Sequence, residues 1–383
     1  MAEKKKIYLD YNATTPTDER VVKEMLPYFT EKFGNSSSVT HTFGWDAEEG
    51  VELARDRISK LIGSKPKEIV FTSGATEAIN TALLGFCRAN KENGNHIITC
   101  KTEHTAVLDT CHQLEQEGFE VTYLPVDTSG NIDVEDLQRA ITRNTILACI
   151  MHANNEIGTI HPLAKISRIT QKAGIILMTD ATQSVGKIPF DVNKSGVDLA
   201  AFSSHKLYGP MGVGALYIKA GIQINPILFG GKQEKKIRPG TLNVPGIVGF
   251  GKACEICDLE MKDESSRLSR LIETIEDELF DIEGLTINGN QSLRLPHMTS
   301  ISITDVDGTR LIRAMKNLAL SQGSACSSNT TQPSHVLKAL GHSDDLALAS
   351  VRIALGRMTT RMEVIDAIKS IKRGISQLKT SNL

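Results

Sequence analysis

Residues 200–214 read Ala-Ala-Phe-Ser-Ser-His-Lys-Leu-Tyr-Gly-Pro-Met-Gly-Val-Gly and join an apolar run to a polar turn. The apolar run, 197–202, stops abruptly at hydroxyls, a histidine and Lys206. A lysine at the mouth of a buried strand suits an amine that loses its proton and bonds covalently to a carbonyl. Ser203, Ser204 and His205 are donors that could hold an anion beside it. The alternative is a lysine that ends the strand with its charge in water.

Short aliphatic runs alternate with helical stretches on both sides of this segment. The runs predict strands at 68–72, 96–99, 120–124, 145–151, 175–180, 199–203 and 213–218. Such alternation is typical of parallel strands joined by crossover helices, so we expect a three-layer α/β/α fold. These sheets bind ligands at the carboxyl ends of their strands.

The last third of the chain has a different pattern. A long helix predicted over 248–279 leads into a smaller α+β region with strands at 286–287, 299–303 and 350–355. We expect a large domain over residues 15–258. Residues 1–14 and 259–383 would form a small domain that carries the loop of Cys326.

Charge and cysteine content exclude several classes of protein. The 383 residues have a formal charge of −2, which favours neither nucleic acid nor an anionic membrane as partner. The basic start has no apolar stretch after it, and no run is long enough to span a membrane. Seven scattered cysteines indicate reduced thiols and a cytoplasmic protein. Cys254 and Cys257 lie on a predicted helix with no second pair, so we expect no zinc.

Two further strand ends carry residues that suit an anion and a cation. Residues 73–76, Ser-Gly-Ala-Thr, follow a strand and open a helix, which offers free backbone N–H groups to an anion; the alternative is a simple helix cap. Asp180 ends an apolar strand, where a carboxylate needs a cationic partner. An aspartate and a covalently bonding lysine together are typical of a pyridoxal phosphate site. A helix cap before Ala181 is the alternative for Asp180.

Three other side chains have chemistry that fits such a site. His104 follows a strand and could stack on the cofactor ring and move protons, or it could be a surface histidine. Arg352, in an alternating strand pattern, suits capture of a carboxylate, or it could be an exposed strand arginine. Cys326 lies among small residues, Gly-Ser-Ala-Cys-Ser-Ser, without the apolar neighbours of Cys149. It is therefore the thiol that we single out as a nucleophile.

The ordered set of motifs resembles the cysteine desulfurases of the NifS/IscS group, which are fold-type-I pyridoxal phosphate enzymes. The resemblance runs nearly from end to end of the chain. It includes the stretches 9–16, 41–44, 71–77, 102–104, 154–158, 180–186, 204–210, 238–241 and 323–327, and Arg352. It implies a mixed, mostly parallel seven-stranded sheet, conversion of L-cysteine to L-alanine, and a homodimer.

The resemblance also implies a role for each matching residue. Lys206 would bond to the cofactor aldehyde and take the substrate Cα proton, Asp180 would pair with the pyridine nitrogen, and His104 would stack on the ring and shuttle protons. Gln183 would contact the ring hydroxyl. The phosphate would be held by Ala75, Thr76, Ser203 and His205, with Thr241 of a partner subunit. Asn155, which also contacts the cofactor, and Arg352 would hold the substrate carboxylate.

The resemblance further implies that Cys326 receives the sulfur as a persulfide and passes it to an acceptor. An iron–sulfur scaffold, a tRNA-thiolation protein or both could be that acceptor, and Cys326 could itself be a transient cluster ligand. The chain ends at Leu383, soon after the last predicted helix, so a docking tail found in some relatives is expected to be absent. The alternatives are a selenocysteine lyase or another aminotransferase-like enzyme, and a non-catalytic scaffold-binding protein.

Overall fold

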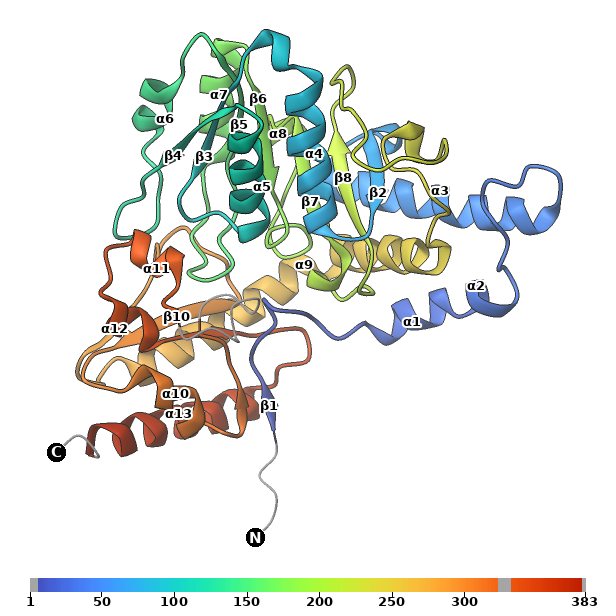
Figure 1. The fold of residues 1–383 in the computed structure, drawn as a ribbon. Helices are drawn as coiled ribbons and strands as arrows, with labels where there is room; N and C mark the ends of the chain where they lie inside the picture. Colours follow the sequence, from blue (N-terminus) through green and yellow to red (C-terminus); the bar gives the residue numbers. More distant parts are fainter. Residues whose placement is uncertain (1–5, 323–331, 381–383) are drawn as a thin grey trace.

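A seven-stranded sheet organises the larger part of the computed structural model, which describes residues 6–322 and 332–380 (Figure 1). Its strands are β2 (Ile69–Thr72), β3 (His96–Cys100), β4 (Glu120–Leu124), β5 (Thr145–Cys149), β6 (Ile176–Asp180), β7 (Leu199–Ser203) and β8 (Gly214–Ile218). The order across the sheet is β2-β8-β7-β6-β5-β3-β4. Strand β8 runs opposite to the other six strands, so its pairs with β2 and β7 are antiparallel and the remaining pairs are parallel. The predicted mixed, mostly parallel sheet is confirmed.

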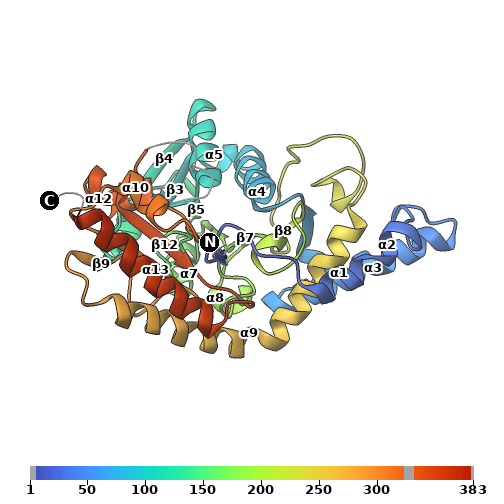
Figure 2. The same ribbon diagram turned by 90° about the horizontal axis from the view of Figure 1, so that it is seen from below.

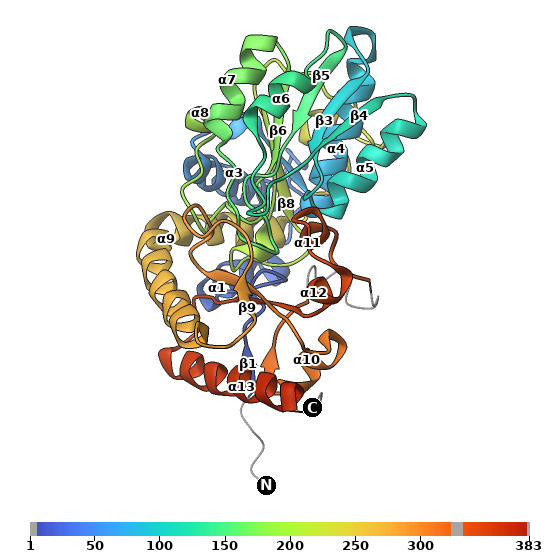
Figure 3. The ribbon, with the colours of Figure 1, turned by 90° about the vertical axis from the view of Figure 1, so that its left-hand side faces the viewer.

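Helices cover both faces of this sheet because successive side chains of each buried strand point to opposite faces. In β2, Phe71 packs into one hydrophobic cluster and Val70 into the other. The helices α4 (Ala75–Ala89) and α5 (Thr105–Gln116) bury their apolar stripes on the Val70 side. On the other side lie α3 (Thr42–Ile62), α7 (Leu163–Ala173) and the first half of α9 (Val244–Leu279). Figure 3 shows the sheet between α5 and α7, as a three-layer fold requires.

The smaller α+β region has a second sheet. Strands β9 (Leu285–Ile287), β10 (Met298–Ile303) and β12 (Ser350–Ala354) pair antiparallel, and β1 (Ile7–Tyr8) pairs in parallel with β11 (Leu318–Ala319). The helices α10 (Gly308–Ala314) and α13 (Arg361–Thr380) contribute to one cluster with these strands. Figure 2 shows α13 crossing the underside of this region. The β1–β11 pair joins the start of the chain to its last third.

One helix runs through both parts. The buried residues of α9 from Val244 to Cys257 belong to a cluster of the large sheet, and those from Leu268 to Leu279 to the cluster of the small region. The domain division at residue 258 stays a prediction, and its boundary falls inside this continuous helix. Cys254 and Cys257 are buried on it as free thiols. In the described part of the chain, no cluster of His, Cys, Asp and Glu residues could hold a metal.

The remaining helices are short. They are α1 (Glu19–Met25), α2 (Pro27–Thr30), α6 (Val134–Ala140), α8 (Val192–Ser195), α11 (His335–Ala339) and α12 (Asp344–Leu348). The first two, with the start of α3, project from one side of the molecule (Figure 1). Across residues 6–322 and 332–380, no helix has the length and apolar character needed to cross a bilayer.

Candidate active site

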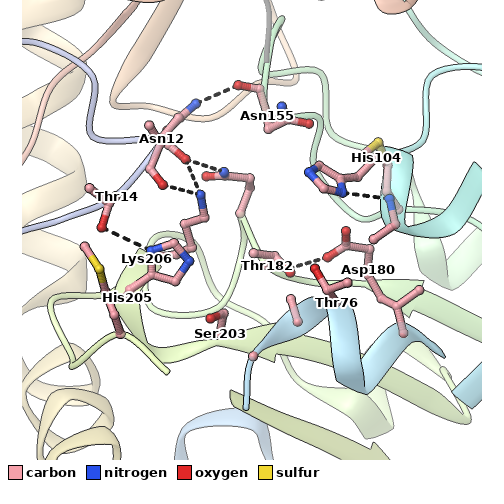
Figure 4. Close-up of a pocket in the computed structure, with 18 of the residues that line it drawn as sticks. Asn12, Thr14, Thr76, His104, Asn155, Asp180, Thr182, Ser203, His205 and Lys206 are labelled. Atoms are coloured by element: carbon pink, nitrogen blue, oxygen red, sulfur yellow. Dashed lines mark hydrogen bonds between the residues drawn. The ribbon is translucent and has the colours of Figure 1, made fainter. Parts of the chain in front are cut away.

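The carboxyl ends of the strands open into a cavity of about 430 Å³. This volume lies in the range of small-molecule sites. Ten residues singled out from the sequence line it: Ala75, Thr76, His104, Asn155, Asp180, Gln183, Ser203, His205, Lys206 and Arg352. Figure 4 shows Lys206 and Asn12 on one side of the cavity and Asp180 and His104 on the other.

One described residue among those predicted for the site does not line the cavity. Thr241 is exposed and is not among the lining residues. Cys326 falls in 323–331, outside the described residues.

Lys206 stands on a single 3-10 turn, residues 204–206, that directly follows β7. Its Nζ donates to the backbone carbonyl oxygens of Asn12 (2.7 Å) and Ala13 (2.6 Å). Two residues later Tyr208 has a φ of 65°, a conformation that side chains other than glycine rarely adopt. Tyr208 is held there by its hydroxyl, which donates to Glu264 (3.0 Å), and by its N–H, which donates to Thr15 Oγ1 (2.8 Å). The strained turn thus gives the Lys206 side chain a fixed starting direction.

Asp180 provides a carboxylate with an oxygen available to a ligand. The residue is 5% exposed, and its Oδ1 accepts the N–H of Thr182 at 2.9 Å. Within the described residues, the other carboxylate oxygen has no hydrogen-bond partner. A buried carboxylate oxygen is costly unless a cation or donor reaches it, so the cavity wall at this point suits a positively charged N–H group.

His104 has its tautomer fixed by the backbone. It is the N-cap of α5, and its Nδ1 accepts the N–H of Ala106 at 3.0 Å (Figure 4). Because Nδ1 is the acceptor, the neutral ring carries its proton on Nε2. The ring therefore has its exchangeable proton at Nε2, the nitrogen not used by the cap.

The start of α4 is an anion cradle. Gly74 caps this helix without a side-chain hydrogen bond, so backbone N–H groups of the first turn remain available. Ser203 and His205 line the cavity beside this turn. Burial, with help from the charges of Lys206 and Lys187, lowers the pKa of His205 to about 4. In the absence of a ligand His205 is therefore neutral at pH 7.

Arg352 lies on β12 and is 2% exposed. Its Nη2 donates to Asp10 Oδ1 (2.7 Å) and its Nη1 to the carbonyl oxygen of Asn155 (3.0 Å). Its Nε is buried without a hydrogen-bond partner in the described part of the chain. Only two of its five N–H groups have hydrogen-bond partners among the described residues, so donors remain for an anionic group.

The sequence reasoning missed two residues that organise the site. Asn12, 1% exposed, contacts Lys206 and Gln183 through its carbonyl oxygen, and His297 through its side chain (2.7 Å). Lys187 contacts Gln183 (2.5 Å). The only sequence signal for Lys187 is a charge within the otherwise apolar stretch 185–190, Val-Gly-Lys-Ile-Pro-Phe.

The comparison with known proteins is decisive for the family. The sequence profile of the class-V aminotransferases matches residues 7–366. The chain belongs to the class-V aminotransferase family. It is 49% identical to "Cysteine desulfurase IscS" of Anaeromyxobacter sp. (strain Fw109-5) over 376 residues, which are 97% of this chain and 93% of that protein. This similarity groups it with the cysteine desulfurases.

Solved structures of the class-V family agree with the fold. A "NIFS-LIKE PROTEIN" superposes with a TM-score of 0.91 at 38% identity, covering 97% of this chain and all of that one. A structure titled "SspA in complex with cysteine" superposes with a TM-score of 0.82 at 34% identity, covering 92% of this chain and all of that one. The predicted resemblance is confirmed, and pyridoxal 5′-phosphate is the cofactor of the family.

Proposed function

We propose that this class-V family member is a pyridoxal phosphate-dependent cysteine desulfurase, which converts L-cysteine to L-alanine and moves the sulfur onto Cys326. The observation that carries the proposal is one cavity that joins Lys206, Asp180 and His104 in a chain 49% identical to a cysteine desulfurase. The reaction needs an amine, an acid and a proton carrier around one substrate, and these three residues supply them.

The residues of the cavity fit the cofactor. The first turn of α4 with Ser203 and His205 suits its phosphate, Asp180 suits its pyridinium nitrogen, and Lys206 suits its aldehyde. When bound, the cofactor supplies an aldehyde that bonds to amines and a conjugated ring that withdraws electrons from the substrate carbon. The Asp180 carboxylate keeps the ring nitrogen protonated, because the charged pair is favoured in a buried site.

Proton movement falls to Lys206 and His104. Two backbone carbonyl oxygens orient the Lys206 amine, and an oriented amine can take the Cα proton of the substrate. The Nε2 of His104 exchanges the thiol proton, since Nδ1 is occupied by the α5 cap. Arg352 and Asn155 hold the substrate carboxylate, and Arg352 shares its guanidinium between that group and Asp10.

The transfer of sulfur balances without an external oxidant. The Cβ–S bond of the substrate breaks, an S–S bond forms to Sγ of Cys326, and the methyl group of alanine takes the proton that the Cys326 thiol gives up. Cβ is reduced, because it keeps the electron pair of the broken Cβ–S bond, and the two sulfur atoms that form the persulfide are oxidised by the same two electrons. A persulfide is a reversible state of cysteine, so the sulfur can pass to an acceptor protein.

A homodimer is part of the proposal. Phe33 and Phe43 are 63% and 48% exposed and pack together, with ring centroids 5.4 Å apart. Val39, 71% exposed, accepts a hydrogen bond from the indole of Trp45 (3.0 Å). A contiguous apolar patch of this kind marks a protein interface. By the resemblance to the family, the second copy would contribute its exposed Thr241 to the phosphate.

The further partners follow from the product. A protein persulfide must be consumed by a thiol or metal-binding acceptor, and we propose an iron–sulfur scaffold or a tRNA-thiolation protein. The six cysteines in the described residues are all free, in keeping with the reducing environment of the cytoplasm, where we place the protein.

The experiment is to follow the absorbance of the purified protein with L-cysteine while alanine and protein persulfide are measured. The unsubstituted protein should have a visible cofactor band and form alanine. Cys326→Ala should keep the band and lose both products, and full turnover in this variant would refute the sulfur transfer. Lys206→Ala should lose cofactor that borohydride can fix to the protein. Alanine from selenocysteine but none from cysteine would instead indicate a selenocysteine lyase.

A further inference from the structure

Lys187 is a second lysine beside the site, and the proposed reaction gives it no role. It lies seven residues after Asp180 and does not line the main cavity. Its Nζ is 2.5 Å from Gln183 Oε1 and 3.5 Å from Asn12 Oδ1. It therefore touches the two residues that lie between it and Lys206.

The hydrogen bonds around Gln183 determine which end of its amide faces which neighbour. The carbonyl oxygen of Asn12 is 3.0 Å from Gln183 Nε2, and a carbonyl can only accept. The Nε2 group must therefore point toward Asn12 and the Oε1 toward Lys187. One N–H of Gln183 is used by Asn12, which leaves the second N–H for the cavity.

We propose that Lys187 is a positioning residue: it locks the Gln183 amide so that Gln183 presents an N–H donor, and no acceptor, to the cofactor. The inference rests on the proposed function, because the ring oxygen of the cofactor is the group that would receive this donor. Asn12 and Lys187 support the same orientation of the amide. Without Lys187 one of these two contacts is lost, and the amide could rotate and turn its oxygen toward the anionic ring oxygen, which is repulsive.

The lock works in either charge state of Lys187. Burial, together with the charges of Lys206 and Arg352, holds the pKa of Lys187 well below its usual value. Glu264 acts in the opposite direction, and His297, which also faces this amine, is itself buried with a lowered pKa. Both an ammonium and a neutral amine have N–H groups to donate to Gln183 Oε1, so the orientation of the amide does not depend on the charge.

The same network reaches Lys206. The carbonyl oxygen of Asn12 accepts from both Gln183 Nε2 and Lys206 Nζ. Asn12 is itself held by His297, whose Nε2 lies 2.7 Å from its Oδ1, and by the carbonyl of Asn155 (3.0 Å). Lys187 thus closes a chain of contacts that fixes the orientation of Gln183 next to the lysine that bonds to the cofactor.

The test is a double-mutant cycle read by the absorbance of bound pyridoxal phosphate as a function of pH. The N–H donor of Gln183 stabilises the ring oxygen most when the lysine-bonded cofactor has lost its proton. Loss of this donor should therefore raise the pH midpoint of the absorbance change. We expect Lys187→Met to raise the midpoint by about one pH unit, the size of a hydrogen bond to a charged group. In the Gln183→Ala background the same substitution should cause no further shift.

Two results would overturn the proposal. One is an unchanged pH midpoint in Lys187→Met. The other is an equal shift with and without the Gln183→Ala substitution, which would mean that the Lys187 charge acts directly on the cofactor or that its loss loosens the whole site. Lys187→Gln keeps N–H donors without the charge and should have the midpoint of the unsubstituted protein. If Lys187→Met does not take up cofactor, the cycle is run with Lys187→Gln, and a one-unit rise there would overturn the proposal. Failure of the unsubstituted protein to bind cofactor would instead contradict the proposed function.

Discussion

In the proposed function, His104 combines a structural and a chemical role in one ring. Its Nδ1 caps α5 and its Nε2 remains for proton exchange. The two roles can be separated because asparagine is a good N-cap but cannot exchange protons near neutral pH.

We expect His104→Asn to lower alanine formation at least 100-fold, the usual contribution of a proton-transfer group. The free energy of unfolding should stay nearly unchanged, because the cap is kept. His104→Ala should lose the same activity and in addition about 1 kcal/mol of stability. Urea unfolding and steady-state rates measure the two effects. Equal stability in both variants would show that the cap contributes nothing.

Asp180 offers a second prediction, with a matched control in the same sheet. Asp180→Asn should keep bound cofactor and lower turnover by roughly 100-fold or more, since the ring nitrogen loses the charge that keeps it protonated. Asp198, the residue just before β7, is also a buried carboxylate, but it forms an ion pair with Lys219 (2.8 Å). Asp198→Asn should lower the urea midpoint and leave turnover per bound cofactor unchanged. A smaller loss in Asp180→Asn than in the control would contradict the assignment.

At the scale of elements, the anion cradle depends on how closely β8 approaches the loop before α4. A Cβ on Gly214 would lie 2.7 Å from the backbone of Gly74 and 2.8 Å from the carbonyl oxygen of Phe202. The backbone must move to relieve such contacts, and Gly74 is the cap of the helix that we propose to hold the phosphate.

Gly214→Ala should therefore weaken cofactor binding, measured as the dissociation constant of pyridoxal phosphate by fluorescence. The overpacking should also cost about 1–3 kcal/mol in unfolding free energy. An unchanged dissociation constant would mean that the close approach of β8 does not control the cradle.

The turn that brings Asn155 to the cavity is sensitive to acid. It is closed by a hydrogen bond from the N–H of His161 to the carbonyl oxygen of His152 (2.8 Å). His161 is 1% exposed, neither ring nitrogen has a hydrogen-bond partner among the described residues, and burial lowers its pKa to about 4. The unfolded chain binds a proton near pH 6.5 and the folded chain only near pH 4. The contribution of neutral His161 to the free energy of unfolding is complete above pH 6.5 and is lost as the pH falls toward 4.

Between pH 6.5 and 4, protonation of His161 should lower the free energy of unfolding by at most about 3 kcal/mol. Urea midpoints measured from pH 7 to 4.5 should fall, and they should fall less in His161→Leu, which cannot take up the proton. The same slope in both proteins would assign the acid sensitivity to other groups.

At the scale of the molecule, the proposed homodimer has the apolar patch of Phe33, Val39, Phe43 and Trp45 in its interface. Phe33→Ser combined with Phe43→Ser should shift the protein from dimer to monomer in light scattering and weaken its hold on the cofactor. Phe280 is 81% exposed and lies outside the patch, so Phe280→Ser is the control and should remain dimeric. A monomeric unsubstituted protein would contradict the proposed homodimer.

The sequence predicted those parts of the molecule that depend on local pattern. The strand periodicity located all seven strands of the large sheet, and the strand ends led to Lys206 and Asp180. Asn12 and Lys187 could not be found in this way. The role of Asn12 arises from contacts with residues 171–285 positions away, to which no local pattern points. Lys187 contacts Gln183 only four residues away, but its burial beside Asn12 depends on the tertiary structure. The partner of Arg352 was likewise unforeseen, because Asp10 lies 342 residues away in the sequence.

That last separation has a consequence for synthesis on the ribosome. Asp10 can meet Arg352 only after residue 352 has emerged from the ribosome, and β1 can pair with β11 only after residue 319 has emerged. The pocket is incomplete before then, so we expect stable cofactor binding to wait for the synthesis of these segments. Contacts between such distant segments also slow folding, and a nascent chain stalled before residue 350 would have Lys206 without the part of the cavity wall that Arg352 provides.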